Sequence, residues 1–404
     1  MEMRRAAIVS PVRTAVGSFG GSLSPLTAGE LGAAVLTALV ERTGIDPARI
    51  TDVVFGHGYP SGEAPAIGRW AALAAGLPET VAGYQVDRRC GSGLQAVIEA
   101  AMMVQTGAAD VVIAGGAESM SNVEHYSTAI RGGKRMGDLQ LHDRLVRARQ
   151  QAQPEQRCGP ISGMIETAEN LARDFSIDRE ACDRYALGSH LRAAQAWRDG
   201  RFDGEIVPVT VPRRRGEPIV FAHDEGYRAD ATLESLDALR PLEGGVVTAG
   251  NASQQNDAAA ACLIVAEDKL AELGLTPDAW LHSWAVTGCD PSRMGIGPVP
   301  AVTKLFERSS LGWDDIGLVE LNEAFAAQVL AVTQGWGWSA DDSRFDITNV
   351  NGSGISLGHP IGVTGLRILA SMVPEMKRRK VQFGLETMCI GGGQGIAAII
   401  EAAF

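Results

Sequence analysis

The stretch DRRCGSGLQAVIEAAMMVQTG, residues 87–107, decides how this chain folds. It opens with a charged turn that ends at Cys90 and continues into helix-forming residues as far as Gly107, a residue type common just after helices. Short apolar runs at residues 82–86 and 111–114 flank it and have the length of buried strands. The sequence therefore predicts strand, helix and strand, with the cysteine where the first strand meets the helix of residues 91–106.

The same alternation continues on both sides of this stretch. We expect strands at residues 6–9, 53–55, 258–266, 316–321 and 385–389, and a helix at residues 31–43. The middle of the chain is polar and irregular, with helices expected only at residues 166–174 and 178–200. The pattern predicts an α/β fold with an N-terminal half (1–120 plus 250–275), an inserted loop domain (121–249) and a C-terminal half (276–404).

The C-terminal half repeats the N-terminal half in outline. Residues 316–321 lead into NEAF much as residues 50–55 lead into GHGY, and NVNGSG at 349–354 precedes a small-residue helix as DRRCGSG does. These similarities indicate an internal duplication.

Composition excludes several classes of function. The net charge is −12 and no basic stripe of domain size is present, so we expect no nucleic-acid partner. The six cysteines form no CxxC pair, which argues against a zinc site and a disulfide scaffold and favours a reducing cytoplasm. No apolar run is long enough to span a bilayer, so we expect no membrane partner.

Cys90 and His359 are the first candidates for chemistry. A thiol at a helix N-terminus feels the positive end of the helix dipole, which is expected to lower its pKa and favour nucleophilic attack. His359, between Gly358 and Pro360, is placed to take the Cys90 proton and later to donate a hydrogen bond to a thioester oxygen. The alternatives are a structural cysteine in the core and a histidine bonded to a turn.

Cys389 and Asn322 are the second pair of candidates. Cys389 ends a strand and runs into a glycine triplet whose N–H groups could form an oxyanion hole, and a second thiol could move a proton at a substrate α-carbon. The Asn322 amide could hold a water that donates to an enolate oxygen, and Glu323 could orient a histidine. The alternatives are a glycine-rich strand end and an ordinary helix cap.

These blocks together resemble the thiolase family, in family order and over nearly the whole chain. They are DRRCGSGLQA, AGGAESMS at 114–121, TAGNAS at 248–253, NEAFA at 322–326, NVNGSGISLGHPIG at 349–362 and CIGGGQG at 389–395. The resemblance implies a five-layered αβαβα core of two similar halves and a loop domain that binds coenzyme A. It implies acyl transfer between coenzyme A thioesters, as in fatty acid metabolism, with coenzyme A as a substrate and no tightly bound cofactor or metal.

The resemblance also implies residue roles. Cys90 resembles the acylated nucleophile, and His359 resembles its base. Cys389 resembles the acid/base at the substrate α-carbon or the incoming thiol. Asn322 resembles the residue that positions an oxyanion-hole water, with His359 completing that hole. The backbone N–H groups of Cys90 and Gly391 resemble a second oxyanion hole. Residues resembling coenzyme A contacts are Met164, Arg214, Ala249, Ser253, Ala324 and Phe325.

RGGKRMGD at 131–138 resembles the basic tetramerisation loop of the family and implies a homotetramer, a dimer of dimers. The chain departs from the family pattern at Gln254, Ala258 and Ser353, which stand where glycines are usual. Ile165 also replaces a glycine, and its bulk is expected to narrow the pocket toward short acyl groups.

The sequence thus predicts a thiolase, with acetyl-CoA acetyltransferase as the expected reaction. Two alternatives stay open at this point: a decarboxylating ketoacyl synthase on the same fold, and a non-catalytic lipid carrier derived from a thiolase.

Overall fold

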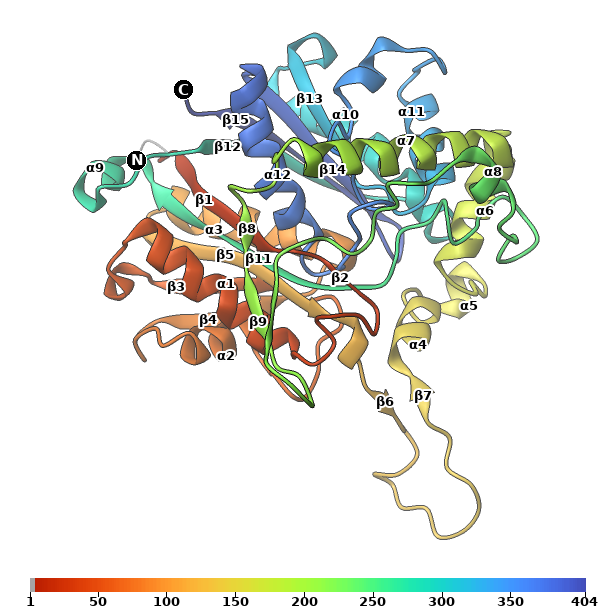
Figure 1. Ribbon diagram of the computed structural model, residues 1–404, viewed down its shortest axis with the longest axis horizontal. Helices are drawn as coiled ribbons and strands as arrows, with labels where there is room; N and C mark the ends of the chain where they lie inside the picture. Colours follow the sequence, from red (N-terminus) through yellow and green to blue (C-terminus); the bar gives the residue numbers. More distant parts are fainter. Residues whose placement is uncertain (1–3) are drawn as a thin grey trace.

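The computed structural model describes residues 4–404 and is built around one long mixed sheet (Figure 1). Its main path runs β13-β14-β15-β12-β1-β11-β5-β3-β4. The N-terminal five strands are β1 (Ala6–Thr14), β11 (Asn256–Ala266), β5 (Val111–Ser119), β3 (Asp52–Gly56) and β4 (Ala82–Val86). The C-terminal four are β12 (Ala279–Gly288), β15 (Gln394–Ala402), β14 (Phe383–Ile390) and β13 (Ile316–Leu321).

The two groups of strands are arranged alike. In the first, β3 is parallel to β5, and β5 and β1 are antiparallel to β11. In the second, β13 is parallel to β14, and β14 and β12 are antiparallel to β15. Within residues 4–404, the two groups of strands join only where β1 pairs with β12, through Ala7 with Trp280 and Ile8 with Ala279. This repeated topology confirms the two similar halves.

Three helical layers enclose the two halves of the sheet. Helices α3 (Ser92–Gln105) and α12 (Thr364–Arg379) lie in the middle, because their apolar side chains share one core cluster with strands of both halves. Helices α1 (Ala28–Thr43) and α2 (Ile67–Ala74) pack on the outer face of the N-terminal strands. Helices α10 (Pro298–Ser309) and α11 (Ala326–Gly335) cover the C-terminal strands. The five layers expected from the sequence are therefore present.

Residues 120–250 form most of the structure outside these layers. They contain β6 (His125–Tyr126), β7 (His142–Asp143), α4 (Arg144–Gln150), α5 (Glu155–Cys158), α6 (Met164–Asp174), α7 (Arg179–Arg198), β9 (Val209–Val211), β10 (Ile219–Phe221) and α8 (Leu233–Asp237). One short strand in this segment, β8 (Ile206–Val207), pairs with β1, so the segment also contributes to the main sheet. The loop between β6 and β7 extends far from the body (Figure 1).

The remaining short elements are β2 (Gly17–Ser18), which pairs with β11, and α9 (Leu270–Leu273). Within residues 4–404, no helix combines the length and the apolar character needed to cross a membrane.

Glycine backbones allow α3, α12 and the strand ends to meet closely. A Cβ on Gly365 would lie 2.2 Å from the backbone nitrogen of Leu94 in α3. A Cβ on Gly56, at the end of β3, would lie 2.4 Å from the carbonyl oxygen of Gly362. No side chain fits at these contacts, which bring the segment that carries His359 against the start of the helix that follows Cys90.

We expect Gly365→Ala to lower the free energy of unfolding by about 1–3 kcal/mol, because the added methyl group must push α12 away from α3. Gly188→Ala is the matched control, since a Cβ on this α7 glycine would meet nothing within 4 Å. It should raise the free energy of unfolding by about 0.5–1 kcal/mol through helix propensity. Chemical unfolding followed by circular dichroism measures both; a Gly365→Ala protein as stable as the parent would show that the contact is not tight.

Candidate active site

A cavity of about 310 Å³ opens beside Cys90 and His359. Its volume lies at the lower end of the range for small-molecule sites. The other side chains that line it are mostly apolar and come from α4, α6 and the loops before β11, before α11 and after His359. They include Met120, Arg149, Met164, Ile165, Ser253, Gln254, Met294, Ala324, Phe325 and Ile361.

Cys90 lies in a single 3-10 turn, Arg89–Gly91, and α3 begins two residues later at Ser92. The N–H groups of Gly391 and of Cys90 itself point at its sulfur. These contacts and the Arg89 charge favour the thiolate, yet burial outweighs them and raises the thiol pKa above its ordinary value. The expectation of a lowered pKa is therefore wrong for this state of the protein, because burial of the thiol outweighs the favourable helix terminus.

His359 is held in one tautomer by its neighbours. Its Nδ1 lies 2.6 Å from the Thr364 hydroxyl, which itself donates to the Pro360 carbonyl at 2.9 Å. The hydroxyl can then only accept from the ring, so Nδ1 carries the hydrogen and Nε2 a lone pair. The His359 backbone N–H donates to Asn256 Oδ1 at 2.9 Å, and Nε2 is buried without a hydrogen-bond partner among residues 4–404.

Burial and the positive charges of Arg367 and Arg149 lower the pKa of His359 to about 3. The imidazole is therefore neutral throughout the physiological range and can accept a proton. Since the Cys90 pKa is raised as well, the resting site holds a neutral thiol beside a neutral imidazole.

Asn322 lies beside the same histidine, with Nδ2 3.5 Å from His359 Nδ1. Its Oδ1 is buried and accepts no hydrogen bond from residues 4–404. The neighbouring Glu323 does not contact His359. It accepts from the Tyr185 and Ser189 hydroxyls at 2.9 and 2.6 Å and from Asn349 Nδ2 at 3.1 Å, so it ties α7 to the loop that precedes α12.

Cys389 is fully buried and does not line the cavity itself. It packs in one cluster with lining residues such as Met294, Ala324 and Phe325. Burial, followed by the proximity of Cys90, raises the pKa of the Cys389 thiol well above its ordinary value. The structure therefore brings Cys90, His359, Asn322 and Cys389 together from both halves of the chain.

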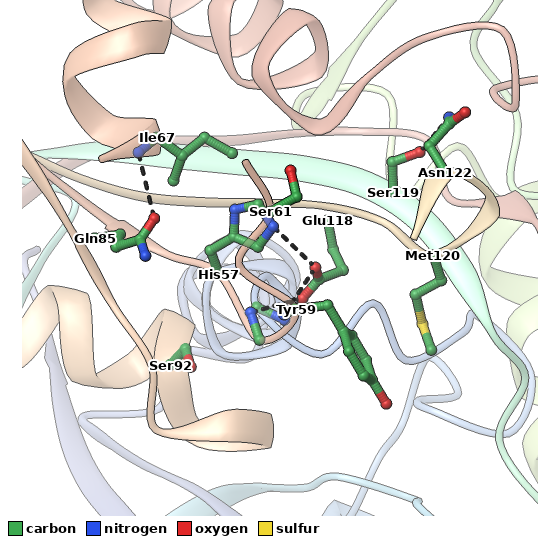
Figure 2. Close-up of polar contacts among 12 residues, drawn as sticks. His57, Tyr59, Ser61, Ile67, Gln85, Ser92, Glu118, Ser119, Met120 and Asn122 are labelled. Carbon is green, nitrogen blue, oxygen red and sulfur yellow. Dashed lines mark hydrogen bonds and ion pairs between the residues drawn. The ribbon is translucent and has the colours of Figure 1, made fainter. Parts of the chain in front are cut away.

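Glu118, in β5, lies beside His57 and Tyr59 (Figure 2) and fixes the loop that follows His359. Its carboxylate accepts the backbone N–H groups of Gly58 at 2.8 Å and Gly362 at 2.9 Å, and it lies 3.4 Å from His57 Nε2. Burial raises the pKa of this carboxyl, although His57 and the backbone donors oppose the shift. The buried Glu118 side chain thus connects the end of β3 to the segment that carries His359.

The predicted coenzyme A contacts divide into two groups. Met164, Ser253, Ala324 and Phe325 line the cavity. Ala249 and Arg214 are exposed and are not among the lining residues. Of the departures from the family pattern, Gln254 and Ile165 line the cavity, whereas Ala258 lies inside β11 and Ser353 accepts from Arg367 at 3.2 Å.

The sequence did not predict the residues that orient His359, nor that Arg149 would line the cavity. Thr364, Asn256 and Glu118 act through contacts between distant segments, and only Thr364, five residues after His359, had a local signal. Arg149 lies in a polar segment whose folding onto the cavity no periodicity reveals.

The cavity brings the Cys90 thiol and the His359 imidazole together, and the comparisons identify the family of the chain. Residues 6–268 match the thiolase N-terminal domain and residues 275–402 match the thiolase C-terminal domain. The chain belongs to the thiolase family. It is an enzyme of acyl transfer, so the non-catalytic and decarboxylating alternatives fall away.

Curated relatives extend over the whole chain. The acetyl-CoA acetyltransferase of Cupriavidus necator is 45% identical over 410 residues, covering 99% of this chain and 100% of the relative. That of Escherichia coli K12 is 45% identical over 402 residues, covering 99% of each.

Solved structures of an acetyl-CoA acetyltransferase and of a 3-ketoacyl-CoA thiolase have the same fold as this chain over nearly its whole length. The Bacillus anthracis acetyl-CoA acetyltransferase superimposes with a TM-score of 0.94 at 42% identity and full coverage of both chains. Human mitochondrial 3-ketoacyl-CoA thiolase in complex with CoA gives 0.91 at 37% identity, covering 99% of this chain and 98% of that one.

We expect alkylation of Cys90 by iodoacetamide to rise about tenfold per pH unit between about pH 6 and 8, because the thiolate fraction grows in that proportion well below a raised thiol pKa. No inflection should appear near pH 6.5, since the His359 pKa is lowered to about 3. Mass spectrometry of the peptide that contains Cys90 follows the reaction, and Cys90→Ala controls for the other thiols. A rate already constant at pH 7 would show that the thiolate is present at rest.

Proposed function

We propose that the cavity is the active site for reversible thiolysis of 3-oxoacyl-CoA, with acetyl-CoA acetyltransferase activity as its simplest form. The observation that carries the proposal is the pairing of Cys90 with His359 at one cavity, with Nδ1 held by Thr364 and Nε2 free. The names of the relatives, acetyl-CoA acetyltransferases, support the same reaction.

In the thiolysis direction, His359 Nε2 takes the Cys90 proton as the sulfur attacks the 3-oxo carbon of the substrate. The bond between C2 and C3 breaks, and acetyl-CoA leaves as an enolate that takes a proton from Cys389. The thiol of coenzyme A then gives its proton to the Cys389 thiolate and attacks the acyl group on Cys90. The bond between the acyl carbon and the Cys90 sulfur breaks, the sulfur takes its proton back from His359, and the shortened acyl-CoA leaves.

Electrostatic stabilisation comes from groups already in place before substrate binds. We infer that the N–H groups of Cys90 and Gly391 hold the oxygen of the acyl-enzyme, and their favourable effect on the Cys90 thiolate supports this role. On the opposite side, Asn322 and His359 hold the enolate oxygen of the departing acetyl-CoA, with Asn322 acting through a water.

We propose that the pantetheine arm of coenzyme A follows the wall formed by Met164, Ser253, Ala324 and Phe325. The CoA-bound human thiolase of the same fold supports a coenzyme A site on this chain. Arg214 and Ala249 remain candidates for contacts with the outer part of coenzyme A, which extends beyond the cavity.

The test is cleavage of acetoacetyl-CoA in the presence of coenzyme A, followed by loss of its enolate absorbance. We expect Cys90→Ala to reduce kcat by at least about 10⁴-fold, because no acyl-enzyme can form. Cys389→Ala should still be acetylated at Cys90 by acetyl-CoA, detected by intact mass, yet fail to condense two acetyl groups. Acylation of a residue other than Cys90 would contradict the scheme.

We further propose a cytoplasmic homotetramer, a dimer of dimers, built through the loop of residues 131–138. The support is that this loop projects from the body and that Met136 on it is 88% exposed, with Ile130, Leu139 and Leu141 also exposed (Figure 1). The six cysteines are free thiols, as in a reducing compartment.

Deleting residues 129–140 should convert the tetramer to a dimer, measured by light scattering after size exclusion, because the loop would supply the contact between dimers. Replacing only Lys134 and Arg135 with alanine separates loss of charge from loss of apolar contact. An unchanged mass for the deletion would contradict the role of the loop.

A further inference from the structure

Arg149 places a positive charge in the wall of an otherwise largely apolar cavity. It lies near the end of α4 and is half-buried. No carboxylate among residues 4–404 lies within ion-pair distance of its guanidinium, and its single hydrogen bond is from Nε to the Tyr59 hydroxyl at 3.3 Å. By contrast, Arg144 on the same helix pairs with Glu124. A half-buried guanidinium with most of its donors unused is suited to an anion supplied from outside.

The position of Arg149 is fixed relative to the nucleophile. Arg89, the residue before Cys90, donates to the Ala148 carbonyl at 2.7 Å and to the Gly58 carbonyl at 2.7 Å, and its guanidinium lies 5.3 Å from the Tyr59 ring centroid. The Tyr59 side chain points away from Glu118 and lies beside Met120 (Figure 2). Arg149 is therefore held by contacts that begin at the residue next to the nucleophile.

The cavity has two walls that belong to different packing clusters. One cluster contains Met164, Ile165, Ala324 and Phe325, the wall assigned above to the pantetheine arm. The other contains Tyr59, Met120, Leu145 and Ile361 with Ala148, and Arg149 belongs to this side. An acyl group on Cys90 that points away from coenzyme A therefore faces Arg149.

The Arg149 charge affects the pKa values of both His359 and Cys90. Burial lowers the pKa of His359 and the Arg149 charge adds to that shift, whereas burial raises the pKa of Cys90 and the same charge opposes it. Glu243 also lines the cavity, but it is exposed and follows Leu242 in the loop before Val246, which packs with the pantetheine wall. Glu243, the one carboxylate among the lining residues that the structure describes, thus belongs to a loop that packs with the pantetheine wall.

We propose that Arg149 binds a carboxylate at the far end of the acyl chain, so that the enzyme prefers 3-oxoacyl-CoA substrates derived from dicarboxylic acids over neutral chains of the same shape. The planar guanidinium matches a carboxylate in a two-point hydrogen bond. This inference rests on the proposed function, because it requires Cys90 to carry the acyl group. The bonds made and broken are those of thiolysis, and the carboxylate takes no part in them.

The experiment compares kcat/KM for matched pairs of substrates. 3-Oxohexanedioyl-CoA is paired with 6-methyl-3-oxoheptanoyl-CoA, in which two methyl groups replace the carboxylate oxygens. In the same way, 3-oxoheptanedioyl-CoA is paired with 7-methyl-3-oxooctanoyl-CoA. In at least one pair, we expect the wild-type enzyme to favour the carboxylate by about 10- to 100-fold, as for a hydrogen-bonded charge. Arg149→Gln should remove this preference, and Arg149→Lys should keep part of it.

The ratio within each pair distinguishes binding of a carboxylate from other roles. If Arg149→Gln lowers kcat/KM equally for both members of a pair, Arg149 acts through Cys90 or the fold, and the inference is overturned. A wild-type enzyme without preference for either carboxylate overturns it too. If Arg149→Gln does not fold, the wild-type preference and its reduction in Arg149→Lys decide the question.

Acetoacetyl-CoA cleavage by the wild-type enzyme keeps the two proposals apart. Cleavage without a carboxylate preference leaves the proposed thiolysis standing and removes only the role of Arg149. If the enzyme cleaves neither acetoacetyl-CoA, nor the two neutral substrates, nor the two dicarboxylic substrates, the proposed function and this inference are both contradicted.

Discussion

Contacts between glycine backbones at the centre of the molecule are the constraint on which the rest of the structure depends. Gly365 meets the start of α3, and Gly362 meets Gly56 and Gly116 from the strand ends of the N-terminal half. Cys90 and His359 belong to segments 269 residues apart, from 90 to 359. They can share a cavity only because these backbones approach without intervening side chains. Glu118 then accepts the Gly362 N–H and fixes the register of the contact.

The site is controlled by burial more than by charge. Exclusion of water raises the pKa values of both thiols and lowers that of His359, so both members of the Cys90–His359 pair are neutral at rest. Backbone N–H groups surround the sulfur, and a fixed imidazole nitrogen is ready to accept its proton. Charge therefore develops only as the reaction proceeds, where the preorganised donors stabilise it most.

The sequence predicted most of the fold, because the signals were local. The strands at residues 82–86 and 316–321 have the predicted bounds, and the helix after Cys90 begins at Ser92 and ends at Gln105. The catalytic candidates came from motif blocks in family order. What could not be predicted depends on contacts between distant segments: the Thr364–His359 hydrogen bond, the reach of Arg149 into the cavity, and the burial that reverses the expected shift of the Cys90 pKa. The sequence predicts that Cys90 lies at a helix N-terminus, whereas burial of the Cys90 thiol depends on how the whole chain folds.

The repeated topology of the two halves has a consequence for how the enzyme is specialised. In each half, a central helix lies in the chain between the two strands of a parallel pair: α3 lies between β3 and β5, and α12 lies between β13 and β14. The turn before α3 carries Cys90, the proposed nucleophile, while the turn before α12 carries His359, its proposed base. Equivalent positions in the two halves thus have different proposed roles, and neither half is a smaller copy of the enzyme. A single half, folded or not, lacks a complete set of reacting groups, so chemistry is a property of the fused pair.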